Sequence, residues 1–104
     1  MTVSPAFQAF AQEAPQFPQP WMAMVGQLAA GTALDAKTEE LAYLAVLAAA
    51  GTESGIAFHV ASARRAGASR DEVISALLVG LPAVGQRVIS SLPAALTAYD
   101  AESA

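Results

Sequence analysis

Apolar residues along this chain recur at helical spacing, three and four positions apart, and no stretch shows a convincing two-residue alternation rich in β-branched residues. This pattern predicts an all-α fold, and the length fits a single domain over residues 1–104. We expect about six helices, over residues 6–14, 21–30, 36–50, 53–66, 70–81 and 86–99.

Residues 1–20 are expected to form an N-terminal helix followed by a proline-rich connector. Ser4 and Pro5 supply a helix N-cap and a first helical residue. Three prolines between residues 15 and 20 favour an extended segment, because proline lacks the N–H donor and restricts the residue before it. Helical spacing resumes at Trp21 and is expected to end at Gly31 as a C-terminal cap.

The segment 36–50 is the most apolar of the predicted helices. Asp35 is its expected N-cap, and carboxylates in its first turn suit the positive end of the helix dipole. Beyond Glu40, apolar side chains occur on every face, which predicts a helix that is buried all round. Gly51 is expected to close this helix and to begin the turn into the next one.

Glycine, serine and proline mark the later helix boundaries. Gly67 is expected to end the fourth helix, and Ser69 with Glu72 forms a capping-box pattern for the fifth. Pro93 lies inside the last predicted helix, after a pair of serines, so we expect a kink or a break there.

The helices at 36–50 and 53–66 are predicted to form a central antiparallel hairpin. A rise of about 1.5 Å per residue places Glu40 roughly 15 Å from the Gly51 turn along one helix, and His59 about 12 Å along the other. The carboxylate and the imidazole are therefore expected at similar heights. A carboxylate beside a histidine fixes its tautomer and supports a general-base role.

Other interpretations of these residues stay open from the residues alone. His59 is the only histidine of the chain, and a lone histidine on an apolar helix is commonly a hydrogen-bonded structural group. Glu40 could be an exposed carboxylate that complements the helix dipole. Tyr43 could be a core residue or the wall of a pocket.

Composition limits the partners of the protein. Hydrophobic residues make up 55% of the 104 residues and charged residues only 13%, whereas about 25% charged residues is usual. A domain of this size cannot hide so much apolar surface alone, so we expect a homo-oligomer. The net charge of −4 and the lack of a basic cluster argue against nucleic acid as a partner.

The chain has no cysteine, which excludes disulfides and thiolate chemistry. With one histidine and scattered carboxylates, we expect no metal site and no cofactor. The apolar run at residues 41–50 is too short for a membrane span, which needs about 20 residues, and no signal peptide is visible. We therefore expect a cytoplasmic protein with no membrane partner.

The residues around the hairpin resemble the carboxymuconolactone decarboxylase family, which includes the alkylhydroperoxidase-like proteins. The family signature runs glutamate, eleven residues, Cys-x-x-Cys, three residues, histidine. Glu40 and His59 stand at the glutamate and histidine positions, and Thr52 and Gly55 stand where the two cysteines would be. The flanking stretches LDAKTEELAYLAVLAAAG and HVASARRAGASRDEVISALLVG also look like the family, so the resemblance covers about residues 34–85. It implies an alkylhydroperoxidase-like helical domain.

The missing thiols change what this resemblance implies. In the peroxidase branch the cysteines attack peroxide and close a disulfide. Thr52 and Gly55 carry no thiol, so we expect no thiol peroxidase activity. The decarboxylase branch also lacks the cysteine pair and keeps the histidine, with a carboxylate in the preceding turn. Glu53 is near that turn, but Ser54 and Gly55 stand closest to it, so the match to that substrate site is incomplete.

Two functions follow as hypotheses. The first is a cofactor-free, lyase-like enzyme in which His59 and Glu40 transfer protons on a small organic acid or lactone. Its substrate pocket is expected to include Thr52, Gly55 and Tyr43. The second is a non-catalytic oligomeric module descended from a thiol peroxidase. The resemblance implies trimers, or hexamers built from them, and a small-molecule ligand is a possible partner.

Overall fold

The computed structural model describes residues 4–102, and all regular structure in this range is helical. The prediction of an all-α fold is confirmed, with more and shorter helical pieces than the expected six or so. The elements in order are α1 (Pro5–Glu13), α2 (Pro18–Gly31), α3 (Ala36–Ala50), the 3-10 helix η1 (Glu53–Gly55), α4 (Ile56–Arg65), α5 (Arg70–Leu78), α6 (Leu81–Val84), the 3-10 helix η2 (Gly85–Ser91) and α7 (Leu92–Glu102).

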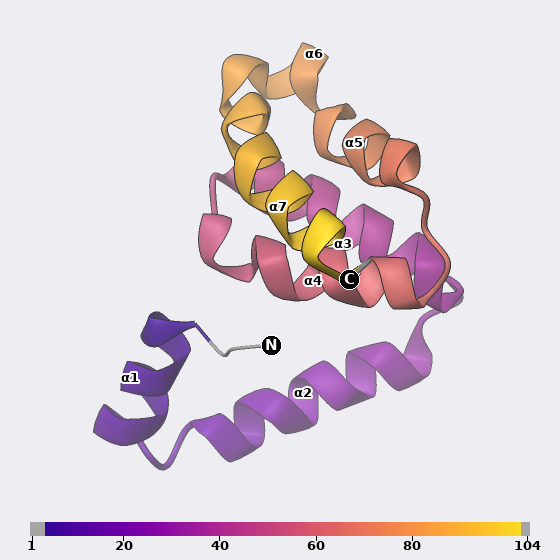
Figure 1. Cartoon of the computed structure of the whole chain (residues 1–104). Coiled ribbons are helices and arrows are strands. Elements are labelled where there is room, and N and C mark those ends of the chain that lie inside the picture. The colour runs from indigo at the N-terminus through magenta and orange to yellow at the C-terminus, as the bar shows by residue number, and fades with distance from the viewer. Residues whose placement is uncertain (1–3, 103–104) are drawn as a thin grey trace. The chain divides into compact units, whose positions relative to one another are not determined.

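The contacts divide the chain into two compact units, Met1–Asp35 and Ala36–Ala104, and each is described here by itself (Figure 1). The expectation of one domain over residues 1–104 stays a prediction. Residues 1–3 and 103–104 of that predicted domain lie outside the described residues.

In the first unit, α1 begins as its sequence predicts. The backbone N–H of Phe7 donates to Ser4 Oγ at 3.1 Å, and Pro5 is the first helical residue. The rings of Phe7 and Phe10 meet edge to face with centroids 5.6 Å apart. The Ser4 cap therefore satisfies one of the N–H groups that a helix start leaves without a partner.

The extended connector predicted for residues 15–20 is wrong. Residues 15–17 form a turn in which the N–H of Phe17 donates to the carbonyl of Ala14 at 3.1 Å, and α2 already begins at Pro18. The first turn of a helix uses none of its N–H groups internally, so Pro18 and Pro20 cost no hydrogen bond there. Gly31 is the last residue of α2, but Thr32 ends the helix with φ −72° and ψ 144°. The Thr32 hydroxyl accepts the N–H of Leu34 at 3.1 Å, so this exit needs no left-handed glycine cap.

In the second unit, α3 has the predicted bounds and ends at a glycine turn. Gly51 takes φ +74°, the left-handed region that glycine adopts without strain. Its N–H donates to the carbonyl of Ala48, and the N–H of Thr52 donates to the carbonyl of Leu47, at 3.2 and 3.0 Å. These are the two bonds of a Schellman motif, and they reverse the chain toward α4.

The core of this unit lies between the α3–α4 hairpin and the helices packed on it, with α5 against α3 and α7 against α4 (Figure 1). Its largest fully buried side chains are Leu44, Ile56, Leu77, Val60, Val73, Val88 and Ser91. The central antiparallel hairpin is thus confirmed.

The prediction that α3 is buried all round is wrong for the single chain. Leu44, Leu47 and Ala48 are buried, whereas Tyr43 is 46% and Val46 62% exposed. The reason is geometric: α4, α5 and η2 cover adjoining sides of α3 and leave the side of Tyr43 and Val46 open.

The C-terminal third is more broken than predicted. The fifth helix ends at Leu78, and the expected helix 86–99 is a 3-10 segment up to Ser91 followed by α7. Pro93 accounts for the predicted break, because it lacks an N–H and its ring would clash with the carbonyl four residues earlier in a continuous helix. The Ser91 hydroxyl is buried and donates to the carbonyl of Val88 at 2.7 Å.

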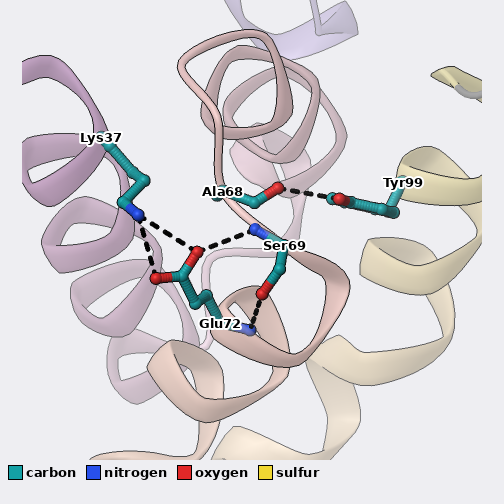
Figure 2. A network of polar contacts seen from close by, with 5 residues as sticks. All are labelled: Lys37, Ala68, Ser69, Glu72 and Tyr99. Carbon is teal, nitrogen blue, oxygen red and sulfur yellow. Dashed lines mark hydrogen bonds and ion pairs between the residues drawn. The ribbon is translucent and has the colours of Figure 1, made fainter.

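Polar contacts tie α3, the α4–α5 loop and α7 together (Figure 2). The capping box is present: Ser69 Oγ accepts the Glu72 N–H, and the Ser69 N–H donates to Glu72 Oε1 at 2.8 Å. Lys37 Nζ reaches Glu72 Oε2 at 3.0 Å. The Tyr99 hydroxyl donates to the carbonyl of Ala68 at 2.8 Å. The loop is therefore anchored from both sides.

One stretch of the described residues, Arg70–Ala101, is long and apolar enough to cross a membrane by length and composition. It is not a single regular α-helix, because it holds α5, α6, η2 and α7 and turns at Gly85, where φ is +76°.

Candidate active site

The hairpin brings the lone imidazole and a carboxylate into direct contact. Glu40 lies near the start of α3 and His59 in the first turns of α4, and His59 Nδ1 is 2.8 Å from Glu40 Oε2. Each side chain is 25% exposed. The predicted meeting of these two groups is confirmed.

This hydrogen bond assigns different tasks to the two ring nitrogens. An ionised carboxylate is only an acceptor, so Glu40 Oε2 accepts a hydrogen bond from the Nδ1–H group of His59. In a neutral ring the other nitrogen, Nε2, then keeps its lone pair. The arrangement therefore supplies a base, Nε2, whose orientation is fixed by the hydrogen bond at Nδ1.

Two aromatic rings flank the imidazole. The Tyr43 ring lies with its centroid 4.3 Å from that of His59 at an angle of 53°, and Phe58 meets His59 edge to face at 5.1 Å. Tyr43 and Phe58 are 46% and 44% exposed. The interpretation of Tyr43 as a core residue is therefore wrong, and its role as a pocket wall stays a prediction.

Phe58 is the neighbour that sequence reasoning missed. Adjacent residues of a helix point in different directions, so helical spacing gives no reason to pair Phe58 with His59. The one sequence feature that could have indicated this contact is that Phe58 directly precedes the lone histidine. In the structure it narrows the space around the imidazole from the α4 side.

Gly55 lies directly against the imidazole. It is the N-cap residue of α4, with φ −92° and ψ −6°. A Cβ at this position would sit 3.7 Å from His59 Cδ2 and 3.3 Å from Leu47 Cδ1. Since Cδ2 adjoins Nε2, a side chain at this position would crowd both Leu47 and the edge of the ring that carries the free nitrogen.

Thr52 is placed differently from the other predicted pocket residues. Its backbone N–H completes the turn after α3. It holds the N-cap position of the 3-10 helix η1, but its exposed side chain makes no capping hydrogen bond there. Among the described residues, the hydrogen bonds and ring contacts of His59 are made with Glu40, Tyr43 and Phe58. The pocket role of Thr52 stays a prediction.

An open, mostly apolar hollow lies elsewhere, between α3 and α5. It is lined by Leu41, Asp71, Glu72, Ser75, Ala76 and Val79. His59 does not contribute to this hollow. Within residues 4–102, no group of three or more metal-ligating side chains comes together.

A sequence model of the carboxymuconolactone decarboxylase family matches residues 15–98, which is most of the chain and includes both residues of the acid–imidazole pair. The chain belongs to the carboxymuconolactone decarboxylase family. It is a cysteine-less carboxymuconolactone decarboxylase family member, since its sequence contains no cysteine. No curated protein and no solved structure matches the chain.

Proposed function

We propose that this family member is a cofactor-free enzyme that transfers protons on a small organic acid or lactone. His59 is the proposed general base, and Glu40 the residue that orients and supports it. The observation that carries the proposal is the 2.8 Å contact between Glu40 Oε2 and His59 Nδ1 in a partly buried setting.

The proposed step begins with His59 Nε2 taking a proton from a carbon next to a carbonyl. The electron pair of the broken C–H bond moves into the carbonyl, which becomes an enolate. The imidazolium then returns the proton to another carbon of the same conjugated system, which completes an isomerisation and restores the neutral His59. Such a positioned base contributes roughly 10²–10⁴-fold in rate.

Glu40 supports this step through charge. While His59 carries the transferred proton, the carboxylate faces an imidazolium instead of a neutral ring. Attraction between opposite charges is stronger in a partly buried site than in bulk water. The Glu40 carboxylate thus stabilises the state that follows proton abstraction.

The second candidate is a non-catalytic oligomeric module. Its support is the loss of both family thiols together with large exposed apolar side chains such as Val46. Against it, His59 bonds a carboxylate and keeps a quarter of its side chain exposed. A purely structural histidine is better satisfied by a backbone carbonyl in a dry core, so we favour the enzyme.

The test uses deuterium exchange and isomerisation of α-angelica lactone in D₂O, followed by proton NMR. The expected result is catalysis by the natural protein and a loss of at least about 100-fold in His59→Gln. Glu40→Gln is expected to lose about tenfold or more, because it removes the charge that stabilises the imidazolium.

The neighbouring variant Glu39→Gln is the matched control, because it makes the same change of charge one residue away, on a different face of α3. It is expected to keep the natural rate. Exchange at an unchanged rate in His59→Gln would contradict the proposed function.

A further inference from the structure

The charges around the imidazole indicate which substrates it accepts. We propose that the Glu40–His59 site selects uncharged carbonyl compounds and discriminates against carboxylates. This inference rests on the function proposed above and narrows its substrate class from organic acids and lactones to uncharged lactones and enones.

Positive charge is scarce in this chain. The chain has five basic residues, and the first 35 residues contain none of them. Each of the five contacts a residue other than Glu40 and His59: Lys37 bonds Glu72, Arg64 bonds the carbonyl of Tyr99 and covers its ring, Arg65 bonds Ser62, Arg70 bonds Asp100, and the Arg87 side chain lies against Gly51. The hydrogen bond and ring contacts of His59 within residues 4–102 are made with Glu40, Tyr43 and Phe58, none of which offers a positive charge to a substrate carboxylate.

The site itself holds a negatively charged side chain, Glu40. A general base must be neutral, so the working pair consists of a neutral His59 and an ionised Glu40. A substrate carboxylate in contact with the unprotonated Nε2 receives no hydrogen bond from it and lies about 7 Å from the Glu40 carboxylate, across one hydrogen bond and the width of the ring. Like charges at that distance in a partly buried site weaken binding by about tenfold or more.

Apolar surface lies beside the base. The Tyr43 and Phe58 rings flank the imidazole, and the Leu47 side chain packs close to Gly55. A small uncharged ring buries apolar surface against these groups at no electrostatic cost. A carboxylate there loses hydration and gains no partner.

The experiment compares cyclohex-2-enone with cyclohex-1-ene carboxylate, two rings of the same size that differ in charge. Binding is read from the nitrogen and carbon NMR signals of the His59 ring, which are unambiguous because the chain has one histidine. At mildly alkaline pH, the natural protein is expected to bind the enone at least about tenfold more tightly than the carboxylate.

Two variants separate local charge from net charge. Glu40→Gln is expected to reduce the discrimination by about tenfold, because it removes the repelling group. Asp71→Asn changes the net charge equally but lies on α5, where it lines the separate hollow, and it is expected to leave the discrimination unchanged.

Three results would overturn the inference: a carboxylate that binds as tightly as the enone, a Glu40→Gln variant with unchanged discrimination, or no response of His59 to either ligand. A carboxylate affinity that disappears in Arg65→Gln or Arg87→Gln would identify the cation responsible.

The binding test and the turnover test fail separately. Selective enone binding without any deuterium exchange would leave the selectivity standing and contradict the proposed function. Deuterium exchange that is faster on a carboxylate substrate than on an uncharged one would support the proposed function and contradict the selectivity.

Discussion

Glu40 and His59 are 19 residues apart in the sequence, and their side chains meet at 2.8 Å. The contact follows from a Schellman turn at Gly51, which reverses the chain so that α3 and α4 run side by side. Because a helix rises by about 1.5 Å per residue, similar counts of residues on either side of the turn bring the two groups level.

Gly55 and Gly80 offer a matched pair for testing access to the base. Their backbone angles are nearly the same, φ −92° and ψ −6° against φ −86° and ψ 1°, and an added Cβ at either meets side chains at ordinary or slightly tight distances. Gly55→Ala is expected to slow lactone exchange several-fold, because its methyl group fills the space beside His59 Cδ2. Proton NMR of the exchange reaction is the measurement.

Gly80→Ala is the control and is expected to keep the natural rate, since its methyl group would meet Val88 and Ala49 rather than His59. Equal rates for the two alanine variants would show that Gly55 does not govern access to the imidazole.

Much of this arrangement could be predicted from local sequence signals. The bounds of α3, the glycine turn at Gly51, the Ser69–Glu72 capping box and the break at Pro93 all depend on a few neighbouring residues. The level placement of the acid–imidazole pair followed from helix geometry alone. These features depend on backbone chemistry, which the sequence states directly.

Other features depend on contacts between distant side chains or on competing rules. The prolines at 15, 18 and 20 predict an extended connector, whereas Pro18 begins α2, because proline in the first turn of a helix costs no hydrogen bond. The exposed side of α3 at Tyr43 depends on which helices pack against it, and periodicity carries no such information. The packing of Phe58 on His59 depends on rotamers, which helical spacing does not predict.

The acid stability of the protein is expected to depend on Glu72 and Asp100. The Ser69 N–H and then Lys37 lower the pKa of Glu72 below its ordinary 4.5, and the hydrogen bond from Arg70 lowers the pKa of Asp100 below its ordinary 3.8. A lowered pKa in the folded state gives stability that is present above the ordinary pKa and is lost as the pH falls below it.

Denaturant titrations from neutral pH downward measure this dependence. The natural protein is expected to lose stability as the pH drops below about 4.5, and the double variant Glu72→Gln, Asp100→Asn is expected to lose less over the same range. The same pH slope in both proteins would contradict the assignment.

Removal of the tyrosine hydroxyl is expected to lower Tm at Tyr99 and to leave Tm unchanged at Tyr43. Tyr99→Phe removes the hydrogen bond to the carbonyl of Ala68 and is expected to cost about 1 kcal/mol, or roughly 4–8 °C in Tm. Tyr43→Phe removes a hydroxyl from an exposed ring but keeps the ring that lies tilted against His59, and it is expected to leave Tm unchanged. Thermal unfolding followed by circular dichroism compares them, and equal losses would contradict this account of the loop anchor.

The exposed apolar side chains predict self-association. Val46 is 62% exposed one turn from Tyr43 on the open side of α3, and such a surface is typical of an interface. Light scattering is expected to give a mass of a trimer or hexamer of the 10.6 kDa chain, and Val46→Lys is expected to lower it while the helical signal is kept. A stable monomer of the natural protein would contradict the prediction.

The central claim is that Glu40 holds the imidazole with its Nδ1 protonated, so that Nε2 is the free base. Nitrogen NMR of the single histidine at mildly alkaline pH tests it most directly, comparing the natural protein with Glu40→Ala. The account predicts a protonated Nδ1 and an unprotonated Nε2 in the natural protein, with a shift toward the Nε2-protonated tautomer in the variant. An Nε2-protonated ring in the natural protein, or the same spectrum in both proteins, would contradict it.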